Sequence, residues 1–134
     1  MYKPVFSKIF YDDLNKCHKY IKETLESPMA AENLKIKLLE TIEYIKENPY
    51  SRSLVQDKFL AFLGLRSIKV KNYLLFYKII ENEVIDKKNI NIFRFMYNKR
   101  DWANIIKKES IDEIMWKTPL RITNGNCTPP CSGG

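Results

Sequence analysis

The side chains that could carry chemistry in this sequence are arginines, lysines and tyrosines gathered in one stretch. They are Arg66, Lys69, Lys71, Tyr73, Tyr77, Arg94, Tyr97, Lys99 and Arg100. Lysine and arginine bind phosphate oxygens, so this set favours a site for nucleic acid. Tyr73 and Tyr77 also share one face of an expected strand, an arrangement more typical of sheet packing than of a substrate platform. Arg66 lies on the same face of the expected strand as Ile68 and Val70, which suits a half-buried structural arginine.

Most other catalytic arrangements are missing from the sequence. His18 is the only histidine and stands on the first expected helix, and no Ser–His or Cys–His pair suggests acyl transfer. Gly64 is the only glycine among residues 1–124, so no glycine-rich phosphate loop is expected. The three cysteines are too few for a disulfide framework and have no further Cys/His pair to complete a zinc site. We therefore expect neither a metal nor a cofactor.

The positive charge of the chain is concentrated in its middle. Residues 52–100 hold 11 basic and 4 acidic side chains, which accounts for the whole net charge of +7. The segments 1–51 and 101–134 each balance to zero. This localisation favours a polyanionic partner, nucleic acid first. At 45% hydrophobic and 29% charged residues the chain is typical of a soluble protein. With no apolar run long enough to span a bilayer, we expect a cytoplasmic location and no membrane.

The first fifty residues predict a short strand and two amphipathic helices. The strand covers residues 2–6, and Ser7 offers an N-cap for the first helix. Ser27-Pro28 ends that helix and begins the second, which stops before Asn48-Pro49. The two apolar stripes consist of Phe10, Leu14, Cys17, Ile21 and Leu25, and of Ala31, Leu34, Leu38, Ile42 and Ile45. Two such helices joined by a tight turn form an antiparallel hairpin.

The next segment changes to a strand pattern. Residues 65–71, 73–80 and 89–97 predict three strands of an antiparallel meander, whose edge the first short strand could join. A last helix is expected from Trp102 to about Ile114. The fold class is therefore α+β, with an N-terminal α-helical hairpin packed on a curved, mainly antiparallel β-sheet and a short C-terminal helix.

The length of 134 residues predicts one domain, which we place at residues 1–118. Residues 119–134 have loop composition without periodicity and form an irregular tail. We assign this tail no function, and whether it is native stays open.

After the two helices the chain reads G-L-R-S-I-K-V-K-N-Y-L-L-F-Y-K-I and, further on, I-N-I-F-R-F-M-Y-N-K-R-D-W. The anchor positions are Gly64, Arg66, Val70, Asn72-Tyr73, Phe76-Tyr77 and Tyr97-Asn98-Lys99-Arg100-Asp101-Trp102. Over residues 2–108 this order resembles the RelE/ParE superfamily of bacterial type II toxins. The resemblance implies a toxin that is neutralised by a small cognate antitoxin encoded beside it.

RelE-like members cut mRNA in the ribosomal A site. The resemblance therefore implies a ribosome-dependent mRNA endonuclease that inhibits translation, with ribosome and mRNA as partners. Attack by the 2′-hydroxyl needs a base, stabilisation of charge on phosphorus and a proton for the 5′-oxygen. On this hypothesis Lys69 or Lys71 is the base or an electrostatic helper, and Arg66 and Arg100 clamp phosphate. Tyr97 stacks a base or assists proton transfer. The surrounding nucleic-acid contacts would come from Arg94, Lys99 and Tyr77.

Two alternatives differ in mechanism. ParE-like members share the fold but poison DNA gyrase without enzymatic activity and generally lack the RNase residues. Leu74 stands where the RNases commonly have an arginine, and Ile105-Ile106 stand where they often have a tyrosine. These two departures favour the ParE-like alternative. A basic binding module without toxicity is the third hypothesis.

Overall fold

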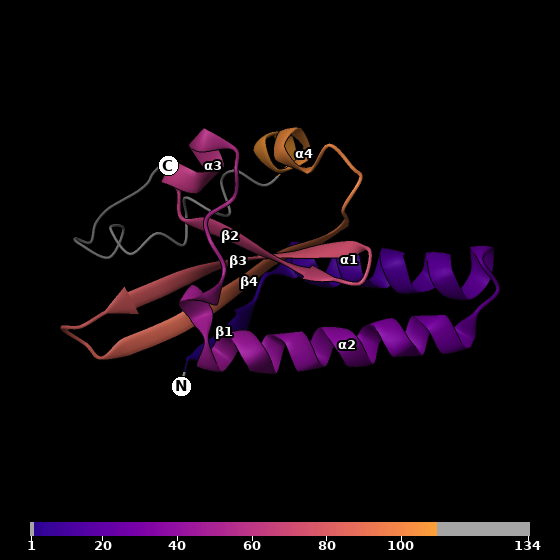
Figure 1. Ribbon diagram of the computed structural model, residues 1–134, viewed down its shortest axis with the longest axis horizontal. Coiled ribbons are helices and arrows are strands. Elements are labelled where there is room, and N and C mark those ends of the chain that lie inside the picture. Colours follow the sequence, from indigo (N-terminus) through magenta and orange to yellow (C-terminus); the bar gives the residue numbers. More distant parts are fainter. Residues whose placement is uncertain (1, 110–134) are drawn as a thin grey trace.

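A sheet with helices on both of its faces makes up the computed structural model, which describes residues 2–109 (Figure 1). Its elements in chain order are β1 (Lys3–Phe6), α1 (Lys8–Lys19), the π-helix η1 (Tyr20–Thr24), α2 (Pro28–Glu47), the 3-10 helix η2 (Pro49–Ser51), α3 (Lys58–Phe62), β2 (Leu65–Val70), β3 (Tyr73–Asn82), β4 (Lys87–Tyr97) and α4 (Trp102–Glu109). This is the predicted α+β class. The expected end of the last helix and the tail 119–134 lie outside the described residues.

The sheet has four strands in the order β1-β4-β3-β2. The strands β2, β3 and β4 form the predicted antiparallel meander, and β1 joins β4 in parallel from Lys3↔Asn89 to Phe6↔Ile92. The β3–β4 hairpin is longer than expected because it pairs out to Asn82↔Lys87. The sheet is therefore mixed, with one short parallel strand on an antiparallel meander.

Both long helices begin at the serines that the sequence indicates. The Ser7 hydroxyl accepts a hydrogen bond from the Phe10 amide at 3.0 Å, and Ser27 does the same for Ala30 at 3.3 Å. Pro28 occupies the first turn of α2, where its missing amide proton costs nothing. These caps fix where each helix starts, and so which residues face the sheet.

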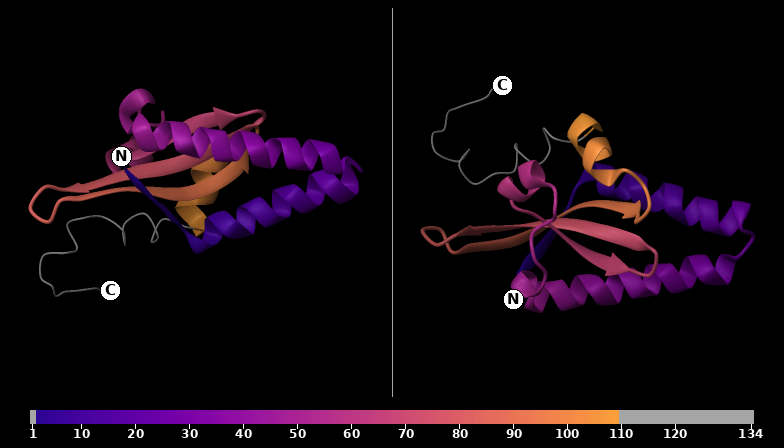
Figure 2. Two further views of the ribbon diagram at one scale, coloured as in Figure 1. Left: turned by 90° about the horizontal axis from the view of Figure 1, so that it is seen from below. Right: turned by 45° about the horizontal axis from the view of Figure 1, so that its top comes forward.

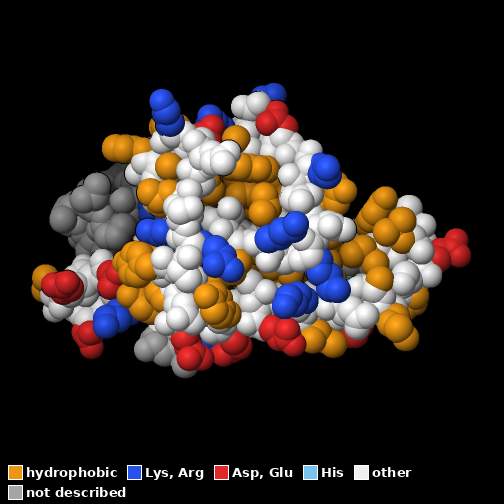
Figure 3. Space-filling model, in the orientation of Figure 1, with side chains coloured by type: hydrophobic (Ala, Val, Ile, Leu, Met, Phe, Trp, Pro, Cys, Tyr) orange, Lys and Arg blue, Asp and Glu red, His pale blue; other side chains and the backbone are white. Residues whose placement is uncertain are grey.

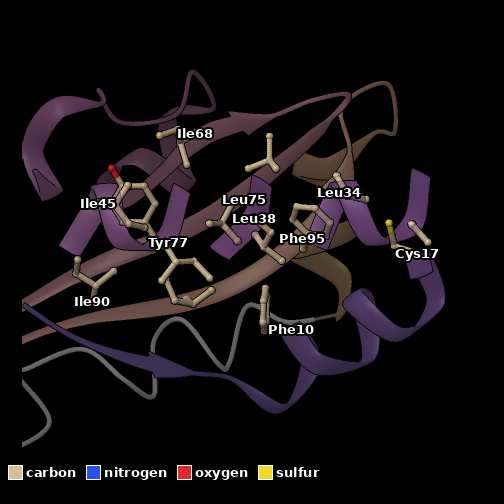
Figure 4. Packing of buried hydrophobic residues seen from close by; sticks show 14 of the residues in the cluster. Phe10, Cys17, Leu34, Leu38, Ile45, Ile68, Leu75, Tyr77, Ile90 and Phe95 are labelled. Carbon is tan, nitrogen blue, oxygen red and sulfur yellow. The ribbon is translucent and has the colours of Figure 1, made fainter. Parts of the chain in front are cut away.

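The core has two parts because helices lie on both faces of the sheet (Figure 2). The larger part lies between the α1–α2 hairpin and the sheet, where Phe10, Leu38 and Ile45 meet Tyr77 and other strand residues (Figure 4). The smaller part lies under α3 and α4 and contains Leu60, Phe76, Phe93, Met96 and Ile106 among others. Alternate residues of β3 thus enter different cores, as the pleat of a strand requires.

Two local features differ from the sequence prediction. The first helix does not continue regularly to residue 25 but passes into the π-helix η1, and Leu25 is 56% exposed instead of buried. The short helix α3 was not predicted; Asp57 caps it by accepting from the Leu60 amide at 3.0 Å. Gly64 follows it at φ 92°, a left-handed conformation that glycine adopts freely.

Replacing Ser7 with alanine is expected to lower the free energy of unfolding by about 2 kcal/mol. The buried Ser7 hydroxyl accepts from the Phe10 amide and also donates to the Phe93 carbonyl at 2.6 Å. The substitution therefore leaves the Phe10 amide and the Phe93 carbonyl without this partner. Ser27→Ala is the matched control, since its longer cap bond is exposed. Urea denaturation measures both; equal losses for the two variants would contradict the role given to Ser7.

Candidate functional site

Two of the residues expected at a nucleic-acid surface are buried. Tyr77 is fully buried, and its hydroxyl donates to the Pro49 carbonyl at 3.0 Å. Arg94 is 3% exposed. Neither side chain reaches the surface, which corrects the expectation that they contact nucleic acid. The sequence pattern had also allowed Tyr77 to pack within the sheet, and the structure confirms that packing role.

The partner that neutralises Arg94 comes from α1. The Asp13 carboxylate accepts from Nε and Nη2 of Arg94 at 2.9 and 2.8 Å, and also from the Phe95 amide at 3.1 Å. Glu109 on α4 accepts from Nη1 at 3.2 Å. Strand β1 ends at Phe6, so the edge of β4 beyond Ile92 has no neighbouring strand, and α1 takes its place. Arg94 is thus a structural link among α1, β4 and α4.

Arg66 is held at the start of β2 by a different group of residues. Its guanidinium lies 5.1 Å from the centre of the Tyr50 ring and donates to the Arg52 carbonyl. The Tyr50 hydroxyl donates to Glu81, and this bond, with some burial, raises the pKa of Tyr50 to about 12. Arg66 therefore packs as a half-buried arginine, the structural alternative that its parity indicated.

Lys69 and Lys99 are both exposed. Lys69 alternates with Ile68 and Val70, whose side chains enter the core beneath the helical hairpin. It therefore projects from the opposite face of β2. Several Lys and Arg side chains lie across the middle of the face shown in Figure 3.

The remaining three predicted residues do come together. Lys71, Tyr97 and Arg100 line a cleft of about 820 Å³ between α1, the start of α2, the β2–β3 turn and the end of β4. Lys71 has φ 55° in the two-residue turn between Val70 and Tyr73. A glycine usually occupies such a position, and a lysine there carries a backbone cost of about 1 kcal/mol. Strain of this kind is often retained where a side chain has a function.

The walls of the cleft are apolar and aromatic. Tyr73 stacks on Phe95 with ring centres 5.1 Å apart, and Tyr97 meets Tyr73 edge to face at 5.7 Å. Burial, followed by hydrogen bonding with the Cys17 thiol, raises the pKa of Tyr73, so its hydroxyl stays protonated at neutral pH. Tyr20 and Leu25 add exposed apolar surface from η1 and the residue after it. The cleft therefore offers an apolar and aromatic surface to solvent.

The electrostatics of the cleft are positive. Lys16 joins Lys71 and Arg100 in its lining, and the lining carboxylate of Asp13 is already paired with Arg94. Sequence reasoning missed Lys16, Tyr20 and the exposure of Leu25, because α1 was read only as a core-packing helix. A π-helical segment such as η1, which is often found at functional sites, has no clear sequence signal.

The positions at which this sequence departs from the RNases of the superfamily lie in or beside the smaller core. Leu74 and Ile105 pack at the edge of the smaller core, and Ile106 is fully buried within it. Of the predicted catalytic residues, Arg66 and Lys69 thus lie outside the cleft lining, whereas Lys71, Tyr97 and Arg100 share it. Within residues 2–109, no group of three His, Cys, Asp or Glu side chains could hold a metal ion. No helix in that range is long and apolar enough to cross a membrane.

Comparison with known proteins identifies the family. Residues 5–102 match the model of the ParE toxin of the type II toxin–antitoxin system parDE. The chain belongs to the ParE toxin family. A solved structure, the chromosomal ParDE toxin–antitoxin system from P. aeruginosa, is similar with a TM-score of 0.55 and 14% sequence identity. The match covers 72% of this chain and 96% of that one, and it supports the same fold. No curated protein matches the chain.

Proposed function

We propose that this ParE-family toxin acts by binding DNA gyrase and inhibiting it, without cutting mRNA. Family membership supports this proposal, since ParE-like members are the gyrase poisons of the superfamily. The observation that carries it is that Leu74 and Ile105-Ile106, at the positions where the RNases have an arginine and a tyrosine, pack in or beside the smaller core. Two residues of the predicted catalytic set also lie away from the cleft, since Arg66 packs on Tyr50 and Lys69 projects from the other face of β2. The cleft keeps Lys71, Tyr97 and Arg100, but it lacks the arginine and the tyrosine that the RNases would use as a phosphate clamp and as a stacking or proton-transfer group.

We further propose that the cleft takes a segment of the cognate antitoxin. Its apolar walls suit hydrophobic side chains, and Lys16, Lys71 and Arg100 suit carboxylates. An antitoxin segment that becomes ordered on binding would anchor in the cleft. The remainder of the antitoxin would then exclude the target sterically.

Inducible expression in a bacterium tests the proposed target. We expect growth arrest together with induction of an SOS reporter, because gyrase poisoning damages DNA. Mapping of transcript ends in the same cells should show no new cleavage sites within translated codons. Arrest with such cleavage sites and no SOS response would assign the toxin to the RelE-like mechanism. Unaffected growth would leave only the hypothesis of a non-toxic binding module.

A further inference from the structure

The β3–β4 hairpin projects beyond the helices on both faces of the sheet (Figures 1 and 2). Its turn spans residues 83–86 and carries Val84, which is 93% exposed, and Ile85, which is 60% exposed. Acidic and hydrophobic side chains gather at this end of the molecule (Figure 3). Two β-branched apolar residues are thus presented to solvent at the outermost point of the hairpin.

The hairpin holds its tip in a defined position. Pairing between β3 and β4 is regular from Tyr77↔Ile92 to Asn82↔Lys87. In the turn, the Val84 amide donates to the Asn82 side-chain oxygen at 3.0 Å. Asp86 has φ 50°, a conformation that aspartate tolerates better than most residues. The apolar pair is therefore preorganised, which lowers the entropic cost of binding.

Local structure gives no reason for valine and isoleucine at the tip. Hairpin turns favour Gly, Asn, Asp and Ser, and β-branched residues are poor turn formers. Exposed as they are, Val84 and Ile85 do not contribute to either core. Around them stand the charged residues Glu81, Glu83, Asp86, Lys87 and Lys88. An apolar centre within a polar rim is the arrangement of a protein–protein interface.

We infer that Val84 and Ile85 at the hairpin tip insert into an apolar pocket of the toxin's protein target. This inference rests on the proposed function, in which the toxin acts by binding a protein. Three carboxylates against two lysines around the tip disfavour a phosphate backbone or an anionic membrane surface. A protein pocket with charges of both signs at its rim complements this tip. The cleft and the tip then serve different partners, the antitoxin and the target.

The test replaces both tip residues with serine and measures binding of the purified toxin to purified gyrase by surface plasmon resonance. Val84→Ser/Ile85→Ser is expected to raise Kd about tenfold or more, since burying two such side chains contributes well above the 1.4 kcal/mol that a tenfold change represents. Because both side chains are exposed, the melting temperature should stay unchanged. Phe62→Ser on α3 is the matched control, as Phe62 is 86% exposed and remote from the tip.

The outcomes separate this inference from the proposed function. Wild-type binding with an unchanged Kd for the tip variant overturns the inference and leaves the proposed function intact. If the wild type does not bind gyrase, the proposed function fails. The role of the hairpin tip is then tested by comparing growth arrest in cells that express the variants. Loss of arrest for the tip variant but not for Phe62→Ser supports the tip as the target contact, whereas equal arrest overturns it. Concentration-dependent self-association that the tip variant abolishes would assign the tip to a second copy and also overturn the inference.

Discussion

Replacing Arg94 with alanine is expected to lower the free energy of unfolding by about 3–5 kcal/mol, the usual cost of leaving one partner of a buried ion pair uncompensated. Arg94 and Asp13 side chains are only 4% and 6% exposed, and their contact at 2.8 Å links α1 to β4. Without the guanidinium, the Asp13 carboxylate stays buried with only the Phe95 amide. Urea denaturation at neutral pH measures the loss.

A double-mutant cycle with Asp13→Ala makes this prediction specific. If the two side chains act as a pair, the double variant loses less stability than the sum of the single variants. Lys99→Ala is the surface control and should change stability by less than about 0.5 kcal/mol. Additive losses, or an Arg94→Ala variant as stable as the control, would show that Arg94 is not the structural link described above.

Reversing both charges of the cleft, Lys71→Glu with Arg100→Glu, is expected to weaken antitoxin binding by about 100-fold. That figure assigns roughly 1.4 kcal/mol, or tenfold, to each cation facing an acidic segment. Isothermal titration calorimetry with the purified cognate antitoxin measures the change. In cells, co-expression of the antitoxin should no longer restore growth, while toxicity without antitoxin persists because the target contact lies elsewhere.

Lys69→Glu with Lys99→Glu is the matched control for the cleft. It changes the net charge equally, and both residues are exposed and outside the cleft lining. An equal loss of antitoxin affinity in the two double variants would mean that the overall field of the protein, not the cleft, attracts the antitoxin. Loss of toxicity in the Lys71/Arg100 variant alone would place the cleft on the target interface and contradict its assignment to the antitoxin.

Local sequence signals predicted the framework of the fold well. The spacing of Ala31, Leu34, Leu38, Ile42 and Ile45 placed α2 correctly, and all five are buried. The serine N-caps and the end of α2 before Asn48-Pro49 were also predictable, because capping depends on residues within one helical turn. The same locality explains why the α+β class followed from sequence alone.

The candidate site was harder to predict because its chemistry depends on distant pairings. Asp13 is 81 residues from Arg94, and nothing in either local pattern shows that one neutralises the other. The position of Arg66 in its strand did indicate a packing role. The Tyr50 ring that contacts it, however, lies outside the strands, so the strand pattern could not show this contact. Sequence patterns therefore located the basic segment, whereas only the fold showed that Lys71 and Arg100 of that segment share a cleft, which Lys16 from α1 also lines.

The most direct test of the central claim is a comparison of two purified reactions with the same toxin preparation. In the first, DNA gyrase supercoils a relaxed plasmid; in the second, ribosomes translate a defined mRNA. A toxin that acts by binding gyrase should block supercoiling at amounts close to those of the enzyme and leave the mRNA intact. Codon-specific cleavage of the translated mRNA with supercoiling unaffected would contradict the account.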